Sequence, residues 1–319
     1  MDTLISNDLA KAAKLLKNGS VVGVPTETVY GLGASIYNAN AIDYIFELKK
    51  RPRTNPLIVH ISSIDQLSEI TTEFPELAQR LATTFWPGSL TMVLPKSDQI
   101  PNHITANKST VAVRIPNHPI FLDLINLAGP IAAPSANPYE RISPTTSAHV
   151  VNYFPKGLPL IVEGGACKNG IESTIVGFEK QQVVVYRLGS ISIEEIESVV
   201  GKVKIKNQAK GENIAPGMSQ KHYAPITKTI LTSAINDFIE DFHDNKIGVI
   251  RFKETTKDQA IFKQLTLAPD GDLKVAASNI YAFLHELDRL NLDFILIEPL
   301  PNIGIGLSIN DRLKRATHI

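Results

Sequence analysis

Apolar residues in the first 200 positions of the chain follow two different spacings. Spacings of three and four residues predict amphipathic helices at residues 8–19, 40–50 and 75–86. Short β-rich runs predict strands at residues 20–25, 56–61 and 90–95. Two more strand-like runs, 173–178 and 183–189, flank the sequence EKQQ and predict a hairpin. Because hairpins and helices are interleaved, we expect a mixed sheet rather than a purely parallel one.

Two serines are placed to begin helices. Ser63 is followed three residues later by Gln66, and Ser192 is followed by Glu195. This is the spacing of a capping box, in which each side chain bonds the other residue's backbone N–H. We therefore expect helices to begin at both serines.

The pattern changes near Gly201. Residues 201–228 are polar, basic and rich in turn-forming residues, and they show no sustained periodicity, so they predict an interdomain linker. Beyond them, strand-like runs alternate with helical segments, which predicts a small parallel-sheet domain. Those strand-like runs are 229–232, 247–252, 265–270 and 293–300. We expect domains at 1–200 and 229–319, joined by the linker.

Composition bounds the class of protein. The 319 residues are 43% hydrophobic and 20% charged, as in ordinary soluble globular proteins. Lys plus Arg and Asp plus Glu both number 32, which gives no overall attraction to nucleic acid or membranes. Cys167 is the only cysteine, so no internal disulfide can form. Neither a signal peptide nor an apolar run of about 20 residues is found, and we expect a cytoplasmic protein.

The first polar cluster, residues 25–34 (PTETVYGLGA), follows a predicted strand and holds more hydroxyl and flexible groups than a simple turn needs. The second, residues 49–60 (KKRPRTNPLIVH), is strongly basic. Its prolines favour an extended conformation, in which Lys49 and Arg51 would point the same way toward one ligand. Guanidinium groups suit phosphate or carboxylate oxygens. The alternative is a solvated helix end.

Further hydroxyl groups lie in residues 133–146 and 164–176, and both segments resemble loops that bind anions, although two ordinary turns would have the same composition. Arg114 and Arg187 each lie inside an apolar strand, where a charge is usually paired or part of a site. A structural salt bridge is the alternative. The chain has no Walker phosphate loop and no metal-binding motif, so we predict no metal-ligand set. The residues thus indicate a nucleotide-like anion held by hydroxyls and cations.

Taken in order, these segments resemble the long form of the threonylcarbamoyl-AMP synthase family. The shared motifs are GVPTETVYGLGA, KKRPRTNPLIVHI, FWPGSLTMVL, VAVRIPNHP, APSAN, SPTT, GIESTIV, YRLG, APGMSQKHYAP and INDRLKRA. The resemblance implies an α/β fold: a YrdC-like mixed twisted sheet with helices and a large cavity, then a small Rossmann-like parallel-sheet domain. It also implies that the linker folds over the active site.

The resemblance implies a nucleotidyltransferase that makes threonylcarbamoyl-AMP and pyrophosphate from L-threonine, bicarbonate and ATP, with Mg²⁺ on the ATP phosphates. A separate tRNA threonylcarbamoyl-transferase complex would use the product, and we expect neither stable tRNA binding nor a membrane. Two alternatives are an RNA-binding module, using linker lysines such as Lys202 and Lys210, and a carbamoyl-transfer domain of the same superfamily.

The family's roles carry over residue by residue. The catalytic residues would be Lys49 and Arg51. The ATP-binding residues would be Arg51, Asn55, Thr110, Asn137, Ser143, Thr145, Arg187 and Tyr223. The L-threonine-binding residues would be Thr28, His60, Arg114, Ser135 and Ser173. Tyr139 and Glu140 depart from the family pattern, which often has small residues there, and their effect on the loop is open.

Overall fold

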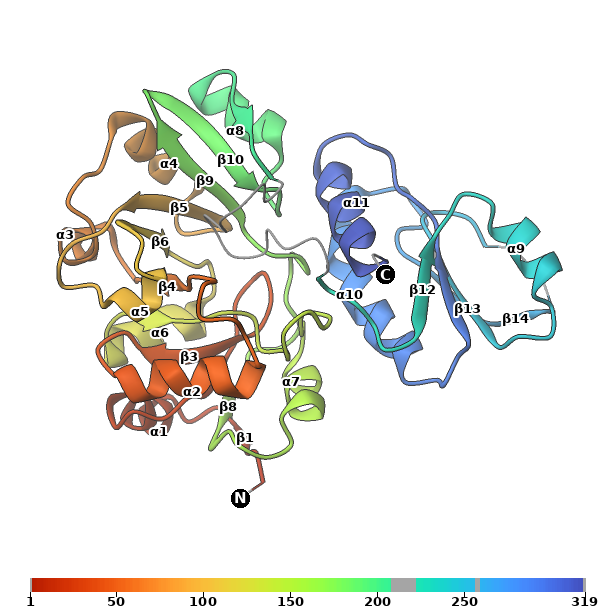
Figure 1. Ribbon diagram of the computed structural model, residues 1–319, viewed down its shortest axis with the longest axis horizontal. Helices are drawn as coiled ribbons and strands as arrows, with labels where there is room; N and C mark the ends of the chain where they lie inside the picture. Colours follow the sequence, from red (N-terminus) through yellow and green to blue (C-terminus); the bar gives the residue numbers. More distant parts are fainter. Residues whose placement is uncertain (1, 208–221, 256–258, 318–319) are drawn as a thin grey trace.

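The computed structural model describes residues 2–207, 222–255 and 259–317, which fold into two parts (Figure 1). The first part is built on a sheet with the strand order β1-β8-β2-β3-β7-β4-β6-β5-β9-β10-β11. Its strands are β1 (Ile5–Ser6), β2 (Val22–Val24), β3 (Gly31–Ser35), β4 (Ile58–His60), β5 (Leu90–Pro95), β6 (Thr110–Arg114), β7 (Ile131–Ala132), β8 (Ile161–Val162), β9 (Thr174–Glu179), β10 (Gln182–Arg187) and β11 (Lys204–Ile205). Strand β6 pairs parallel with β4 and antiparallel with β5, so the mixed sheet is confirmed. The hairpin of β9 and β10 is also confirmed.

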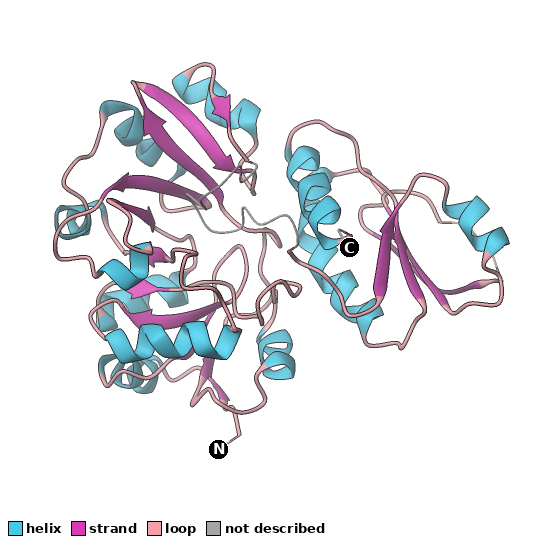
Figure 2. Ribbon diagram, in the orientation of Figure 1, coloured by secondary structure: helices cyan, strands magenta, loops and turns pink. Residues whose placement is uncertain are grey.

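Helices of the first part pack beside this sheet (Figure 2). They are α1 (Leu9–Lys17), α2 (Ala39–Lys49), the 3₁₀ turn η1 (Ile64–Gln66), α3 (Leu67–Ile70), α4 (Glu76–Phe85), α5 (Asn102–Thr105), α6 (Pro119–Ala128), α7 (Ser147–Tyr153) and α8 (Ile193–Val200). None of the helices in the described ranges combines the length and apolar character needed to cross a bilayer.

One of the two predicted capping boxes forms. Ser192 caps α8, and the reciprocal bond from its backbone N–H to Glu195 is present. The box at Ser63 is wrong, because the Ser63 side chain makes no capping bond to the 3₁₀ turn. The side chain of Gln66 instead reaches back one residue further and accepts a hydrogen bond from Ser62 N at 2.7 Å.

The second part has a four-stranded parallel sheet in the order β12-β15-β13-β14, as predicted. Its elements are β12 (Lys228–Leu231), α9 (Ile235–Asp241), β13 (Ile247–Arg251), β14 (Ile261–Thr266), α10 (Leu273–Asp288), β15 (Phe294–Ile297) and α11 (Ile305–Ala316). The strand expected at 265–270 begins at Ile261 instead. It lies at the edge of the sheet, and the exposed Phe262 and Lys263 disrupt the alternation that marks a half-buried strand.

The segment expected to be the linker is only partly described, since residues 208–221 lie outside the described ranges. Its first residues extend the large sheet: Lys204 and Ile205 of β11 pair in parallel with Val184 and Val185 of β10. Such short strands are easily missed in a polar sequence, because two residues cannot show a period.

The two parts share a buried apolar cluster. Helices α10 and α11 lie between the small sheet and the first part (Figure 1). Val29 and Ile171 of the first part join Tyr281 and Ile309 of these helices in one cluster. Gly170, at φ +70°, permits the close approach, because a Cβ there would lie 2.4 Å from the Ala277 carbonyl oxygen. The second part is therefore packed directly against the loop that leads to β9.

Candidate active site

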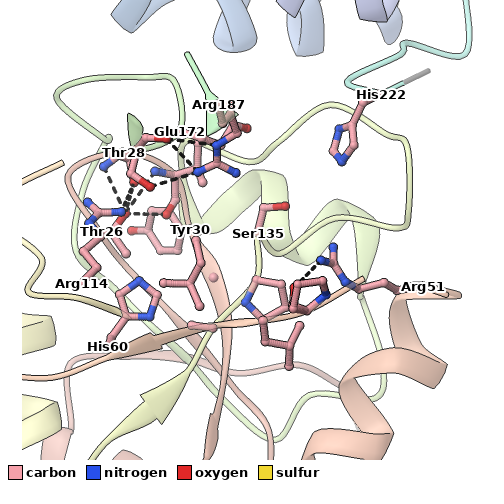
Figure 3. Close-up of a pocket in the computed structure, with 18 of the residues that line it drawn as sticks. Thr26, Thr28, Tyr30, Arg51, His60, Arg114, Ser135, Glu172, Arg187 and His222 are labelled. Carbon is pink, nitrogen blue, oxygen red and sulfur yellow. Dashed lines mark hydrogen bonds between the residues drawn. The ribbon is translucent and has the colours of Figure 1, made fainter. Parts of the chain in front are cut away.

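Most of the polar side chains singled out in the sequence surround one cavity in the first part (Figure 3). The residues that line it are Thr26, Thr28–Gly31, Arg51, Pro56–Ile58, His60, Arg114, Ala133–Ser135, Glu172, Ser173, Arg187, His222 and Tyr223. The acid and guanidinium groups that line it are those of Glu172 and of three arginines, Arg51, Arg114 and Arg187. The arginines come from separate segments and lie on different sides in Figure 3. The cavity is therefore suited to anions.

The loop after β2 is closed by its own hydroxyl groups. The Thr26 hydroxyl oxygen accepts from the backbone N–H groups of Thr28 (3.0 Å) and Val29 (3.1 Å), and the hydroxyl donates to the Val29 carbonyl (2.7 Å). The Tyr30 hydroxyl donates to the Gly165 carbonyl at 2.8 Å. These bonds hold buried polar groups in a fixed turn and leave Thr28 beside the cavity. They account for the unusual polarity of residues 25–34.

Arg114 ends β6 and is almost fully buried. Its guanidinium forms an ion pair with Glu27 at 2.5 Å and donates to the Thr28 hydroxyl (3.1 Å) and the Gly88 carbonyl (2.9 Å). The sequence predicted either a site residue or a structural salt bridge at Arg114. Arg114 is both, because it lies in a buried salt bridge and also lines the cavity. Glu27 was not predicted to be its partner.

His60 lies next to Arg114, since the two residues are paired in register on the parallel strands β4 and β6. Burial, together with the nearby Arg114 charge, lowers the pKa of His60 to about 3. The imidazole is therefore neutral at physiological pH and can hydrogen-bond a ligand without adding charge.

Arg51 and Arg187 also line the cavity, with Arg187 beside Glu172 and Arg51 apart from both at the right of the view (Figure 3). Arg51 donates to the carbonyls of Asn55 (3.2 Å) and Pro56 (2.8 Å). Burial lowers the pKa of Arg51 to about 10, which still leaves it charged at neutral pH. Arg187 donates from two nitrogens to the Ser173 carbonyl, at 3.0 and 2.8 Å, and from one of them to the Ser173 hydroxyl at 3.0 Å. Backbone carbonyls thus fix both guanidinium groups.

Lys49 takes a different position from the one expected. It is the last residue of α2, and Lys50 turns the chain in the left-handed conformation at φ 53°. The idea that Lys49 and Arg51 share one face of an extended segment is therefore wrong. The buried Lys49 ammonium donates to the carbonyls of Ser135 (2.6 Å) and Asn137 (2.5 Å), and so it holds the loop that bears Ser135.

The predicted site residues divide into two groups. Those that line the cavity are Thr28, Arg51, His60, Arg114, Ser135, Ser173, Arg187 and Tyr223. Those that do not line it are Lys49, Asn55, Asn137, Ser143 and Thr145, which are all buried, and the half-buried Thr110 at the start of β6. Asn137, for example, donates to the carbonyls of Pro138 and Arg141 within its own loop.

Comparison with known proteins shows which family the chain belongs to. One family model, described as "Telomere recombination", matches residues 14–189, and a second, described as "Threonylcarbamoyl-AMP synthase, C-terminal domain", matches residues 191–317. A protein of Pyrococcus abyssi named threonylcarbamoyl-AMP synthase is 40% identical over 317 residues, covering 96% of this chain and 93% of the relative. One of Bacillus subtilis with the same name is 39% identical over 328 residues, covering 99% and 95%. The chain belongs to the threonylcarbamoyl-AMP synthase family.

Solved structures agree with this assignment. The crystal structure of P. abyssi Sua5 complexed with L-threonine matches with a TM-score of 0.94 and 38% identity, covering 99% of this chain and 98% of that one. The match spans both parts of the molecule, so the long form of the threonylcarbamoyl-AMP synthase family is confirmed.

The residues that depart from the usual pattern of the threonylcarbamoyl-AMP synthase family contact the described last part of the predicted linker. Tyr139 packs edge-on against His222, with ring centroids 6.0 Å apart. Glu140 has φ 67°, and its carbonyl accepts from Ala224 N at 2.8 Å. The Tyr223 ring stacks on Tyr281 of α10 at 5.7 Å. The larger residues thus help to hold His222 and Tyr223 at the cavity wall.

Sequence reasoning missed the acids that lie beside the arginines of the cavity. Besides Glu27, Glu172 is buried at the cavity and accepts from Ser143 at 2.6 Å, Tyr281 at 3.0 Å and Arg312 at 2.9 Å. Burial raises the pKa of Glu172, but the charges of Arg312 and Arg187 outweigh it and hold that pKa below its usual value. A signal was available, because Arg312 falls at helical spacing from Ile305 and Ile309 on the buried face of α11.

Proposed function

We propose that this chain forms threonylcarbamoyl-AMP and pyrophosphate from L-threonine, bicarbonate and ATP. The observation that carries the proposal is the convergence of Arg51, Arg114 and Arg187 on one cavity, in a chain that matches synthases of this name over nearly its whole length. Guanidinium groups suit carboxylate and phosphate oxygens. A carboxylate and a triphosphate are therefore fitting ligands for this cavity.

L-Threonine is proposed to lie on the side of Arg114. Arg114 would bind its carboxylate, while the Thr28 hydroxyl and the neutral His60 would bind its polar groups. These three residues are adjacent through the β4–β6 register and the Arg114–Thr28 bond. Ser135 and Ser173 line the same cavity and complete the proposed set.

ATP is proposed to lie on the side of Arg51 and Arg187. These arginines would contact the phosphates, and Tyr223 lines the same cavity. The remaining members of the proposed set are Asn55, Thr110, Asn137, Ser143 and Thr145, which do not line the cavity and would act by fixing its loops. Lys49 would act through the Ser135–Asn137 loop, to which its ammonium is bonded.

The reaction needs charge stabilisation more than a covalent enzyme intermediate. The threonine amine and bicarbonate give a carbamate with loss of water, and a carbamate oxygen then attacks the α-phosphorus of ATP. The new P–O bond forms as the bond to pyrophosphate breaks, and negative charge lies on the phosphoryl oxygens. Arginines already fixed by backbone carbonyls can stabilise that charge with little reorganisation.

Mg²⁺ is proposed to arrive on the ATP phosphates, as part of the substrate. Within the described ranges, no group of three or more His, Cys, Asp or Glu residues could hold a metal ion. The two acids nearest the arginines are already engaged, Glu27 by Arg114 and Glu172 by Arg312. The carboxylates of the described residues therefore do not fit a resident metal site, and no step is assigned to one.

We also propose that the product passes to a separate tRNA threonylcarbamoyl-transferase complex in the cytoplasm. The alternative of an RNA-binding module relies on the linker lysines, of which Lys210 lies outside the described residues. Lys206 is bonded to Glu179 at 2.8 and 2.6 Å, which reduces the positive charge available to phosphates. A gel shift with tRNA at low and high salt tests that alternative.

The test of the proposed function is a reaction with purified protein, magnesium-ATP, L-threonine and ¹³C-bicarbonate. Mass spectrometry should detect threonylcarbamoyl-AMP carrying one ¹³C atom, together with pyrophosphate, and omission of threonine should abolish both. Pyrophosphate release that does not depend on threonine would contradict the proposal. Product formed only from carbamoyl phosphate would favour the carbamoyl-transfer alternative.

A further inference from the structure

Arg312 of α11 reaches from the second part of the molecule to the edge of the cavity. It is 1% exposed and is one of the largest fully buried side chains. Its Nε donates to the Glu172 carboxylate at 2.9 Å, and a terminal nitrogen donates to the Leu188 carbonyl at 2.5 Å. A single guanidinium therefore holds two segments of the first part.

Both segments carry cavity residues. Glu172 itself lines the cavity and precedes Ser173, and Leu188 follows Arg187. Arg187 in turn donates to the Ser173 carbonyl and hydroxyl. The segments are packed closely, because a Cβ on Gly189 would lie 2.3 Å from Thr174 N. A displacement at Glu172 or Leu188 would therefore move Ser173 and Arg187.

The Glu172 carboxylate is surrounded by groups that favour its charged form. Arg312 comes from α11, the Tyr281 hydroxyl from α10 and the Ser143 hydroxyl from the first part, while Arg187 lies nearby on β10. The Arg312 guanidinium also lies over the Tyr223 ring, 5.1 Å from its centroid. With Arg312 present, the carboxylate is paired from outside the cavity. Without it, a buried negative charge would face the site where anionic ligands are expected, and it would be drawn toward Arg187.

We propose that Arg312 is a positioning residue for the reaction, which neutralises Glu172 and fixes Arg187 and Ser173 relative to each other. This inference rests on the proposed function. It gives the second part of the molecule a role in catalysis, although none of the cavity-lining side chains in the described ranges belongs to residues 229–317.

The test compares Arg312→Met, Arg312→Lys and the double variant Arg312→Met/Glu172→Gln with the wild type in the complete reaction. Lys314→Met is the matched control, because Lys314 is exposed on the same helix. We expect Arg312→Met to lower kcat/KM for ATP at least tenfold, Arg312→Lys to recover part of it, and Lys314→Met to remain within twofold of wild type. In the Glu172→Gln background, Arg312→Met should lower kcat/KM for ATP by less than threefold.

The pH dependence of kcat/KM distinguishes a positioning role of Arg312 from a general loss of structure in the variant. Removing the Arg312 charge should raise the pKa of Glu172, so the acidic limb of kcat/KM should move to higher pH in Arg312→Met. Tyr281→Phe removes one hydrogen bond to the same carboxylate and should move this limb in the same direction, which keeps the test valid if Arg312→Met does not fold. The positioning role alone would be overturned if the wild type is active and Arg312→Met has the same rate and pH profile. If Arg312→Met does not fold, an unchanged rate and pH profile in both Arg312→Lys and Tyr281→Phe would overturn it. A wild type that makes no product would overturn the proposed function as well.

Discussion

The buried ammonium group of Lys49 donates a 2.5 Å hydrogen bond to the backbone carbonyl of Asn137. A second bond joins it to the carbonyl of Ser135 at 2.6 Å, and Ser135 lines the cavity. Burial lowers the pKa of Lys49 well below its usual value. Lys49 is therefore placed to fix the position of a cavity loop.

Replacement of Lys49 by Met should lower the free energy of unfolding by about 2–3 kcal/mol, because two buried carbonyl groups lose their donor. It should also raise KM for both threonine and ATP, since the loop carries Ser135, proposed for threonine, and Asn137, proposed for ATP. Urea denaturation and steady-state kinetics check these effects. Lys50→Met is the control, because Lys50 is exposed. A change in KM for ATP alone, with unchanged stability, would instead indicate direct contact between Lys49 and the phosphates.

Replacement of Glu27 by Gln should destabilise the ligand-free protein by about 3–5 kcal/mol, because the charge of the buried Arg114 then has no compensating acid. The double variant Glu27→Gln/Arg114→Met should be more stable than the sum of the two single changes predicts, with a coupling of about 1–3 kcal/mol. Chemical denaturation of the four proteins measures this coupling. Strictly additive effects would show that the pair acts independently.

A stacked histidine pair joins the two parts of the molecule. His149 of α7 and His285 of α10 have ring centroids 3.9 Å apart. Burial, together with the charges of the nearby His285 and Arg289, lowers the pKa of His149 to about 3. For His285, burial and Arg289 outweigh a hydrogen bond to the Ser143 carbonyl and lower the pKa to about 4. Both rings are therefore neutral at pH 7.

This pair should make the protein less stable in mild acid. An unfolded histidine binds a proton below about pH 6.5, while the folded pair does not until about pH 4, so stability falls as the pH drops through this window. Each histidine should cost on the order of 2 kcal/mol at pH 5. Unfolding free energies at pH 7.5 and 5 should differ less in His149→Asn/His285→Gln than in wild type. His243→Asn, at an exposed position, is the control, and an identical pH dependence in all three proteins would rule out this role.

Much of the fold follows from local periodicity. Helices α1, α2, α4 and α8, the β9–β10 hairpin and the small parallel sheet were predicted because their apolar residues face a core at regular spacing. Helices α5, α6 and α7 were not predicted. The other exceptions are short or exposed strands. Strand β11 has two residues and β14 lies at an edge, so neither shows a clear period.

The site was predicted less completely, because its partners are distant in sequence. Arg114 and Arg187 were singled out because each is a charged residue inside an apolar strand. The partner of Arg114, Glu27, lies 87 positions earlier in the sequence. Glu172 is held by Arg312 across the boundary between the two parts, and the helical spacing of Arg312 indicates its burial but not its partner. Lys49 fell in both a predicted helix, 40–50, and a predicted extended segment, 49–60, and the structure places it in the helix.

The central claim is that one cavity binds an amino acid beside Arg114 and a triphosphate beside Arg51. Titration calorimetry with L-threonine and with a non-hydrolysable ATP analogue, on wild type, Arg114→Gln and Arg51→Gln, tests it most directly. Loss of a charge-assisted hydrogen bond should weaken binding by roughly 10- to 100-fold. We predict that Arg114→Gln loses threonine affinity and keeps ATP affinity within about threefold, and that Arg51→Gln shows the reverse. Equal losses for both ligands in both variants, or no loss in either, would contradict the account.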